Sequence, residues 1–187
     1  MTWLPAVSLL MAAFLWASSF IALKLAFSSY APMFVIFGRM AVASVCFLFF
    51  LPGFLKKIEY RRGDMRYILL MAFCEPCLYD IFEARAVVNT TASQMGMICA
   101  TLPLIVAVTA GIFLKERISP KTGLGFFVAI FGACWLSISA EASPDAPNPA
   151  LGNFYEFLAM VCATGYITTC KYLTSRYSPF FLTAIQA

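Results

Sequence analysis

Long apolar runs without charge constrain this chain more than any other feature of its sequence. Residues 3–23, 92–114 and 122–140 contain no acidic or basic residue over 21, 23 and 19 positions. A helix needs roughly 20 apolar residues to cross about 30 Å of hydrocarbon, and soluble helices and strands use shorter runs. Three further apolar runs of similar length contain charged residues, at 31–55, 67–88 and 154–170. The sequence therefore predicts six membrane-spanning helices and an all-α polytopic membrane protein.

The composition agrees with a lipid bilayer as the solvent. Hydrophobic residues make up 62% of the chain and charged residues 12%, and the mean hydropathy is +0.85. A soluble domain of this size needs more polar surface than that. The seven cysteines all lie inside the apolar runs, which is poor placement for a secreted disulfide framework.

Basic residues are unevenly distributed among the loops, and this bias predicts the orientation. The loop at 56–66 carries five of the thirteen Lys and Arg residues, the loop at 115–121 carries three, and Lys171 and Arg176 follow the sixth run. The loop at 141–153 has two acids and no base. Because loops rich in Lys and Arg stay cytoplasmic, we expect a plasma-membrane protein with a cytoplasmic N-terminus. Membrane insertion explains these short basic clusters, so we expect no nucleic-acid partner.

A seven-residue segment has a near copy elsewhere in the chain, with Ser, Tyr, Pro and the final Phe in register. SSYAPMF at 28–34 follows the first run, SRYSPFF at 175–181 follows the sixth, and the offset is 147 residues. Five predicted spans separate the copies, so the second copy is turned over relative to the first. Such inverted repeats are the building plan of many secondary transporters, whose substrate binds where the halves meet. We therefore predict an inverted five-helix repeat.

The domain organisation follows from this repeat. Residues 1–140 form the first five-helix transmembrane repeat, 141–153 form an outer linker loop rich in proline, and 154–187 begin a second repeat that is incomplete. The chain thus covers six helices and the start of a seventh.

Several segments resemble the EamA-like branch of the drug/metabolite transporter superfamily. They are FLWASSF (14–20), PMFVIFGRM (32–40), TASQMGMICATLPLIVAVTAGIFLKERIS (91–119) and TGLGFFVAIFGACWL (122–136). The resemblance implies a permease that moves a small metabolite or drug by alternating access, without covalent chemistry or a cofactor. Members of this family typically have ten helices, so we expect a fragment or a truncated product, whose partner is a missing C-terminal repeat or a second copy in a homodimer.

Charged residues inside the predicted spans are the candidate site. Arg39 lies about 10 Å below the outer end of the second span, and Asp80 and Glu83 lie about 7–12 Å below the outer end of the third, at 1.5 Å per residue. Asp80 and Glu83 are three residues apart and share a helix face. Because charge in a bilayer is costly, we predict that Arg39 pairs with one of these carboxylates beside a polar cavity. The pair either couples substrate or protons, or is a structural ion pair between two helices.

Glu75 is a further candidate in the middle of the third span. It precedes Pro76, which frees a backbone carbonyl one turn earlier. Glu75 is either a proton relay or a neutral structural carboxyl that hydrogen-bonds this carbonyl. Glu156, by contrast, is expected near the outer start of the sixth span, close enough to water to need no special role.

Prolines and small residues predict how the helices bend and pack. Pro76 and Pro103 are predicted kinks in the third and fourth spans, and the kink at Pro103 favours rocking between inward- and outward-open states. Small residues recur at helical spacing, which allows close approach of two backbones in lipid. They form either contacts inside the repeat or a homodimer face: Gly96, Ala100, Gly125, Ala129 and Gly132.

Other classes of protein are less consistent with these residues. A membrane-embedded thiol redox protein would use Cys74 and Cys77, and an inactive truncated remnant would act only as an interaction partner. The chain has no histidine, no phosphate-binding glycine loop and no metal-ligand spacing. We therefore predict that it is not an enzyme and binds no metal.

Overall fold

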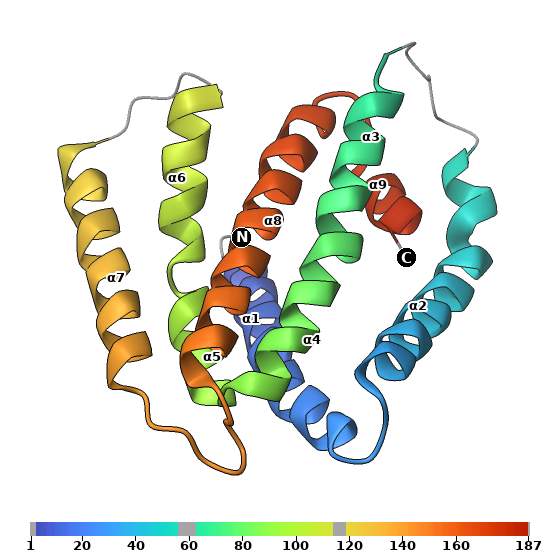
Figure 1. Ribbon diagram of the computed structural model, residues 1–187. Helices are drawn as coiled ribbons and strands as arrows, with labels where there is room; N and C mark the ends of the chain where they lie inside the picture. Colours follow the sequence, from blue (N-terminus) through green and yellow to red (C-terminus); the bar gives the residue numbers. More distant parts are fainter. Residues whose placement is uncertain (1–2, 56–62, 114–118, 187) are drawn as a thin grey trace.

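The fold is built from helices that run side by side, as a computed structural model shows for residues 3–55, 63–113 and 119–186 (Figure 1). Apart from an isolated bridge between Ser143 and Ala146, no β-structure occurs among these residues. The helices are α1 (Trp3–Phe27), α2 (Pro32–Leu55), α3 (Met65–Ala72), the π-helix η1 (Phe73–Leu78), α4 (Tyr79–Asn89), α5 (Ala92–Cys99), α6 (Leu102–Phe113), α7 (Pro120–Ser139), α8 (Pro149–Leu173) and α9 (Pro179–Gln186).

These elements correspond to the six expected spans, and the prediction of an all-α polytopic membrane protein is confirmed. Helices α1, α2, α7 and α8 each form one span, α3, η1 and α4 together form the third, and α5 and α6 form the fourth. Proline opens α2, α7, α8 and α9, because the first helical position needs no N–H partner. Four segments are long and apolar enough to cross a membrane by length and composition: Trp3–Phe27, Pro32–Phe49, Ala92–Phe113 and Pro120–Ser139.

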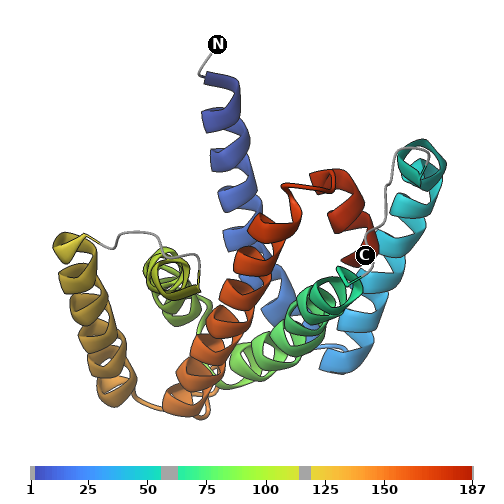
Figure 2. The same ribbon diagram turned by 90° about the horizontal axis from the view of Figure 1, so that it is seen from above.

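The two less apolar spans form the centre of the bundle. Helix α8 packs along α4, η1 and α3, with α5 and α6 on its other side (Figures 1 and 2). Gly152 of α8 allows the closest approach, since a Cβ at this position would lie 2.6 Å from Thr90 Cβ and 2.8 Å from Thr90 N. Ala159 and Ala163 are buried on the same side of α8. A stripe of small residues thus brings the α8 and α4 backbones together.

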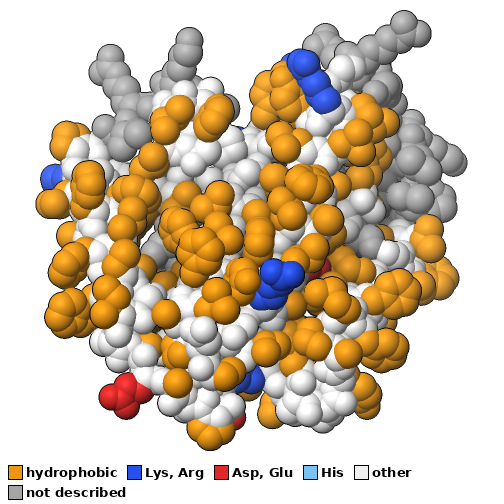
Figure 3. All heavy atoms as spheres, in the orientation of Figure 1, with side chains coloured by type: hydrophobic (Ala, Val, Ile, Leu, Met, Phe, Trp, Pro, Cys, Tyr) orange, Lys and Arg blue, Asp and Glu red, His pale blue; other side chains and the backbone are white. Residues whose placement is uncertain are grey.

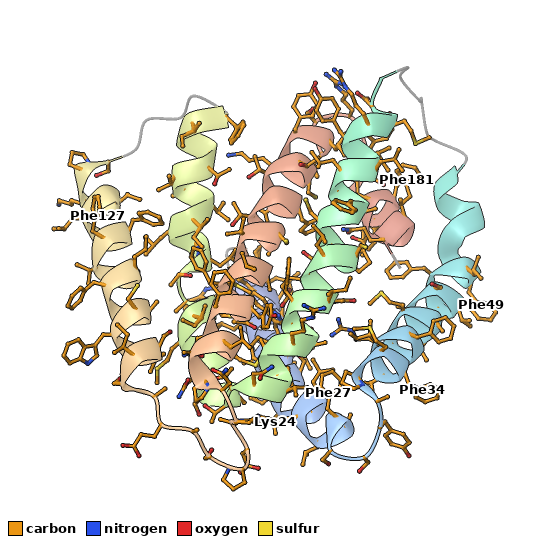
Figure 4. All side chains as sticks on the ribbon, in the orientation of Figure 1. Lys24, Phe27, Phe34, Phe49, Phe127 and Phe181 are labelled. Atoms are coloured by element: carbon orange, nitrogen blue, oxygen red, sulfur yellow. The ribbon has the colours of Figure 1, made fainter. Side chains whose placement is uncertain are left out.

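Two apolar helices at the edges of the bundle, α2 and α7, turn large side chains outward. Phe127 of α7 and Phe49 of α2 are 72% and 80% exposed and point away from the bundle in Figure 4. In Figure 3, hydrophobic side chains are spread over the described part of the visible face, and charged ones are few. A surface of this kind is matched to hydrocarbon rather than to water.

Two of the spans are interrupted where the sequence places proline. Glu75, before Pro76, has φ −145° and ψ 125°, and the surrounding residues form η1 instead of a regular α-helix. In the fourth span, α5 ends at Cys99 and α6 begins at Leu102, directly before Pro103. Both interruptions break the helical hydrogen-bond ladder in the middle of a span, as expected for proline.

The two copies of the repeated segment lie at opposite ends of the bundle. Phe34, in the first copy, is at the lower end in Figure 4, and Phe181, in the second copy, is at the upper end. The loop at 140–148 shares the lower end with the first copy (Figure 1). This placement is the one that an inverted repeat requires. Most of the basic loop residues, as well as most of the LKERIS motif, fall at 56–62 and 114–118, outside the described residues.

The small residues that were predicted to form helix contacts differ in how closely other atoms approach them. A Cβ at Gly96 or Gly132 would meet no described atom within 4 Å, so neither glycine makes a close contact inside the described repeat, and the alternative of a homodimer face stays a prediction. Only Gly125 has a near neighbour, Leu104 Cδ2 at 3.6 Å. Ala100, Ala129 and Gly132 instead line a cleft of about 440 Å³ between α5–α6 and α7. The spacing of small residues leaves room for a second helix, but the spacing alone does not determine whether another helix packs there.

Candidate functional site

The centre of the site is a forked ion pair between α2 and α4. Arg39 Nη1 lies 3.2 Å from Glu83 Oε2, and Arg39 Nη2 donates to Asp80 Oδ1. Asp80 and Glu83 are 5% and 2% exposed. Their spacing of three residues on α4 puts both carboxylates on the side that faces α2. One guanidinium therefore serves two buried carboxylates.

Two aromatic side chains extend the fork to α1. Tyr79 donates its hydroxyl hydrogen to Glu83 Oε1 at 2.8 Å, and Trp16 Nε1 donates to the Tyr79 hydroxyl at 3.4 Å. Tyr79 is buried, and it begins α4 directly after η1. The chain of hydrogen bonds thus links α1, α4 and α2 through side chains of Trp16, Tyr79, Glu83 and Arg39. Trp16 and Tyr79 were not predicted from the sequence, because the contact that joins them spans 63 residues, although the bond from Tyr79 to Glu83 spans only four.

A cavity of about 440 Å³ opens beside these groups. Helices α1, α2, α4, α6 and α8 and the π-helix η1 all contribute to its walls, and all four predicted site residues are among the lining residues. The lining consists of Trp16, Ser19, Arg39, Met40, Glu75, Pro76, Tyr79, Asp80, Glu83, Leu102, Ala163, Tyr166 and Ile167. Its size falls in the range of small-molecule sites, which combine apolar walls with a few polar groups.

The hydrogen-bonding capacity of the fork is not exhausted. Asp80 Oδ2 and Arg39 Nε are buried and have no hydrogen-bond partner within the described part of the chain. Buried polar atoms normally have partners, and leaving one unpaired costs about 1–3 kcal/mol. A site with spare donors and acceptors next to a cavity is chemically able to bind a polar solute.

Glu75 occupies the interrupted part of the third span. Its carboxyl lines the cavity, and its backbone carbonyl accepts a hydrogen bond of 3.0 Å from Gln186 Nε2 of α9. Gln186 is offset from Arg39 by the same 147 residues that separate the two repeat copies. The corresponding residues of α2 and α9 therefore both contact the third span, Arg39 through a charged fork and Gln186 through one neutral hydrogen bond.

Glu156 corrects the expectation drawn from the sequence. It is 0% exposed, it accepts a hydrogen bond of 3.1 Å from Cys99 Sγ at Oε1, and Oε2 has no partner among the described residues. Helix α8 begins at Pro149, earlier than the expected span start at 154, so Glu156 lies about 10 Å inside the helix at 1.5 Å per residue. The signal that could have placed it is its position in the stripe of Gly152, Ala159 and Ala163, which marks the packed face of α8.

A second polar cluster closes the lower end of the α4–α8 pair. Asn153 Nδ2 donates to Gln94 Oε1 at 2.9 Å and to Ser137 Oγ at 3.2 Å. Thr90 Oγ1 lies 2.8 Å from Gln94 Oε1 and 2.9 Å from Asn153 Oδ1. These bonds connect α5, α7 and α8 across a buried interface, where unpaired polar groups would be destabilising.

Lys24 fastens α1 to the same end. Its ammonium group donates to the carbonyl oxygens of Val87, at 2.9 Å, and of Thr90 and Asp145 (Figure 4). Two of these carbonyls lie at the end of α4, where backbone acceptors lack helical partners. The three donors of the ammonium group are thereby satisfied by two acceptors at the end of α4 and one in the loop at 140–148.

The cysteines are free thiols and belong to no metal-binding group among the described residues. All seven are free thiols, Cys77 is exposed, and Cys74 Sγ would lie 3.0 Å from a Cβ added at Gly165. No group of three metal-binding side chains occurs within residues 3–55, 63–113 and 119–186.

The fold and the cavity together define a polytopic helical membrane protein with a solute-sized polar site inside the bundle. Residues 3–138 match the EamA-like transporter family, and the chain belongs to this family.

Curated relatives carry the same description. The chain is 26% identical over 156 residues to the uncharacterized transporter YetK of Bacillus subtilis. The matched region covers 79% of this chain and 46% of YetK. The chain is 24% identical over 174 residues to an uncharacterized transporter of Archaeoglobus fulgidus (90% and 58%) and 26% identical over 186 residues to YcxC of B. subtilis (97% and 58%). The chain thus spans about half the length of the curated relatives it matches. No solved structure gives a significant match.

Proposed function

We propose that this protein is a plasma-membrane permease that moves a small metabolite or drug by alternating access, with its N-terminus in the cytoplasm. The observation that carries the proposal is the cavity of about 440 Å³ that brings Arg39, Glu75, Asp80 and Glu83 together inside the bundle. Charged side chains in a membrane interior typically line substrate or ion pathways. A reaction on the solute would need a nucleophile with its base, or a metal, and the proposal includes no such step.

The contacts of Arg39 suggest how binding is coupled to movement. Its fork is the polar link between α2 and α4, since both carboxylates belong to α4 and the guanidinium belongs to α2. A solute that takes over one arm of the fork weakens the link between these helices. The interruptions at Pro76 and Pro103 supply positions where spans can bend without breaking a regular hydrogen-bond ladder. The site therefore has both a polar switch and segments able to move.

The proposal includes a second half that completes the permease. The match to this chain covers 46–58% of each relative, and transporters of inverted-repeat design bind substrate between two halves. We propose that a second five-helix repeat, or a second copy of the chain in a homodimer, faces the first repeat across the cavity.

The test is solute flux into vesicles that contain the full-length protein, measured against a panel of metabolites. The double variant Arg39→Gln with Asp80→Asn removes the fork while keeping the side-chain volumes similar. We expect the flux of the transported solute to fall by about a hundredfold, as removal of a coupled charged pair affects both binding and the conformational cycle. Glu141→Gln, in the exposed lower loop, is the matched control and keeps full flux. Full activity of the double variant contradicts the proposal for this site.

The orientation has its own test. Reporter fusions at residues 29 and 176 are expected to place these positions in opposite compartments, with residue 176 in the cytoplasm. Fusions that report the same compartment contradict the inverted arrangement.

A further inference from the structure

The cavity carries more negative than positive groups. Three carboxylic acids line it, Glu75, Asp80 and Glu83, against a single guanidinium from Arg39, and no lysine is among the lining residues of the described chain. Arg39 is already shared between Asp80 and Glu83. If these groups are ionised, the site lacks about two positive charges. A buried deficit of this kind is costly in a membrane interior and is removed by protons or by a bound cation.

The carboxyl oxygens without a hydrogen-bond donor show where the cavity lacks positive charge. Both oxygens of Glu83 have a donor, since Tyr79 donates to one and Arg39 to the other. Asp80 is only 5% exposed and lines the cavity, and its Oδ2 has no partner in the part of the chain that the structure describes. Glu75 lines the same cavity and forms no side-chain hydrogen bond with the described residues. Acceptor capacity is therefore left over at Asp80 and Glu75, and among the described residues Arg39 Nε is the buried donor of the fork that lacks a partner.

The walls around these carboxyls suit an apolar body with a positive charge. Trp16, Tyr79 and Tyr166 present aromatic rings to the cavity, and Met40, Leu102 and Ile167 are its apolar neighbours. Aromatic faces attract ammonium groups by about 0.5–2 kcal/mol, more when the group is desolvated. An anionic solute would gain Arg39 but meet three carboxyls, which is unfavourable at close range.

We propose that this cavity selects organic cations, namely amines or quaternary ammonium compounds with an aromatic or aliphatic body. The ammonium group lies between Asp80 and Glu75, and the body lies against the aromatic wall. The inference rests on the proposed function, since it names the class of solute that the permease site binds.

The test compares two probes of similar shape and opposite charge, phenyltrimethylammonium and benzenesulfonate. Equilibrium binding is measured calorimetrically with the full-length protein in nanodiscs of phosphatidylcholine, whose headgroups carry no net charge. We expect the cation to bind at least about tenfold more tightly than the anion, which corresponds to one differential ionic contact of about 1.4 kcal/mol.

Variants then connect this preference to the named carboxyls. Glu75→Gln and Asp80→Asn are each expected to weaken phenyltrimethylammonium binding about tenfold, whereas Glu141→Gln leaves it unchanged. Thermal unfolding of each variant shows whether it is folded, and Glu75→Gln keeps the test decisive if Asp80→Asn does not fold.

Three outcomes overturn the inference. They are tighter binding of benzenesulfonate, cation binding that neither variant changes, and no binding of either probe. If the anion binds and Arg39→Gln abolishes its binding, the cavity is still a solute site and the permease proposal stands without its cation selectivity. Loss of the permease proposal itself requires the flux experiment with the double variant to show full activity.

Discussion

Helices α7 and α8 follow one another in the chain and show opposite relations between apolarity and burial. Helix α7 contains no charged residue from Thr122 to Ser139, and none of its apolar window is buried. Helix α8 is too polar to qualify as a span by apolarity alone, yet it contains the fully buried Glu156 and Asn153. In water the more apolar helix would be inside.

The difference shows that the surrounding solvent is hydrocarbon. Lipid tails are as apolar as leucine, so an apolar side chain gains nothing by leaving them for the protein interior. Polar groups gain much, because their hydrogen-bond partners are found only inside the bundle. The least apolar spans, α3–η1–α4 and α8, therefore form the centre, and the cavity with Arg39 lies beside them.

The largest effect on stability is expected from filling the α4–α8 interface. Gly152→Ala places a methyl group 2.6–2.9 Å from backbone and Cβ atoms of Asn89 and Thr90, which cannot move as a flexible side chain could. We expect a loss of about 3 kcal/mol of stability, at the upper end of overpacking effects. Gly132→Ala on α7 is the matched control, because its Cβ meets open space. Thermal unfolding in detergent measures both, and equal melting temperatures would show that α8 does not pack as described.

The next effect concerns the buried carboxyl of α8. A charge at Glu156 without a cation is costly, so we expect this side chain to hold a proton in the folded protein. Glu156→Gln keeps the shape and is expected to change the stability by less than about 0.5 kcal/mol. Glu156→Ala removes the partner of Cys99 and leaves a void, at a cost of about 2 kcal/mol. Strong destabilisation by Gln contradicts the neutral state.

The two copies of the repeated segment give a smaller contrast. Tyr177 is buried in the second copy and donates to Asp64 Oδ2 at 3.1 Å, whereas Tyr30, at the same position of the first copy, is 61% exposed. We expect Tyr177→Phe to cost about 1 kcal/mol of unfolding free energy, the value of one buried hydrogen bond. Tyr30→Phe is expected to have no measurable effect. Similar losses in both variants would mean that the two copies are held alike.

The sequence predicted the spans and much of the site for a clear physical reason. A charge in a long apolar run is rare, so Arg39, Asp80 and Glu83 were conspicuous, and their depths along two helices placed them at the same level. The prolines at 76 and 103 were equally readable, because proline interrupts a helix wherever it lies in the interior.

The remaining features depend on which helices become neighbours. Trp16 and Tyr79 meet across 63 residues of sequence, and no local pattern announces that contact. Gly96 and Gly132 are small residues inside helices, and no described atom lies within 4 Å of a Cβ added at either. Gly152 and Ala159 are also small residues inside a helix, but they are packed against neighbouring parts of the chain. Glu156 was misjudged because its helix starts five residues earlier than the apolar run, which moves it from the membrane surface into the bundle.

The cavity is expected to be reached by water, whereas the outer face of α7 is expected to contact lipid. The accessibility of single cysteines to a water-soluble reagent tests this difference directly. In a background without native cysteines, Ser19→Cys lies on the cavity wall, and Val128→Cys lies on α7, where the native side chain is 63% exposed. A membrane-impermeant, water-soluble methanethiosulfonate reagent is applied to each side of the membrane. We expect it to modify the Ser19→Cys variant and to leave the Val128→Cys variant unmodified. Modification of the Val128→Cys variant with protection of the Ser19→Cys variant would contradict the account.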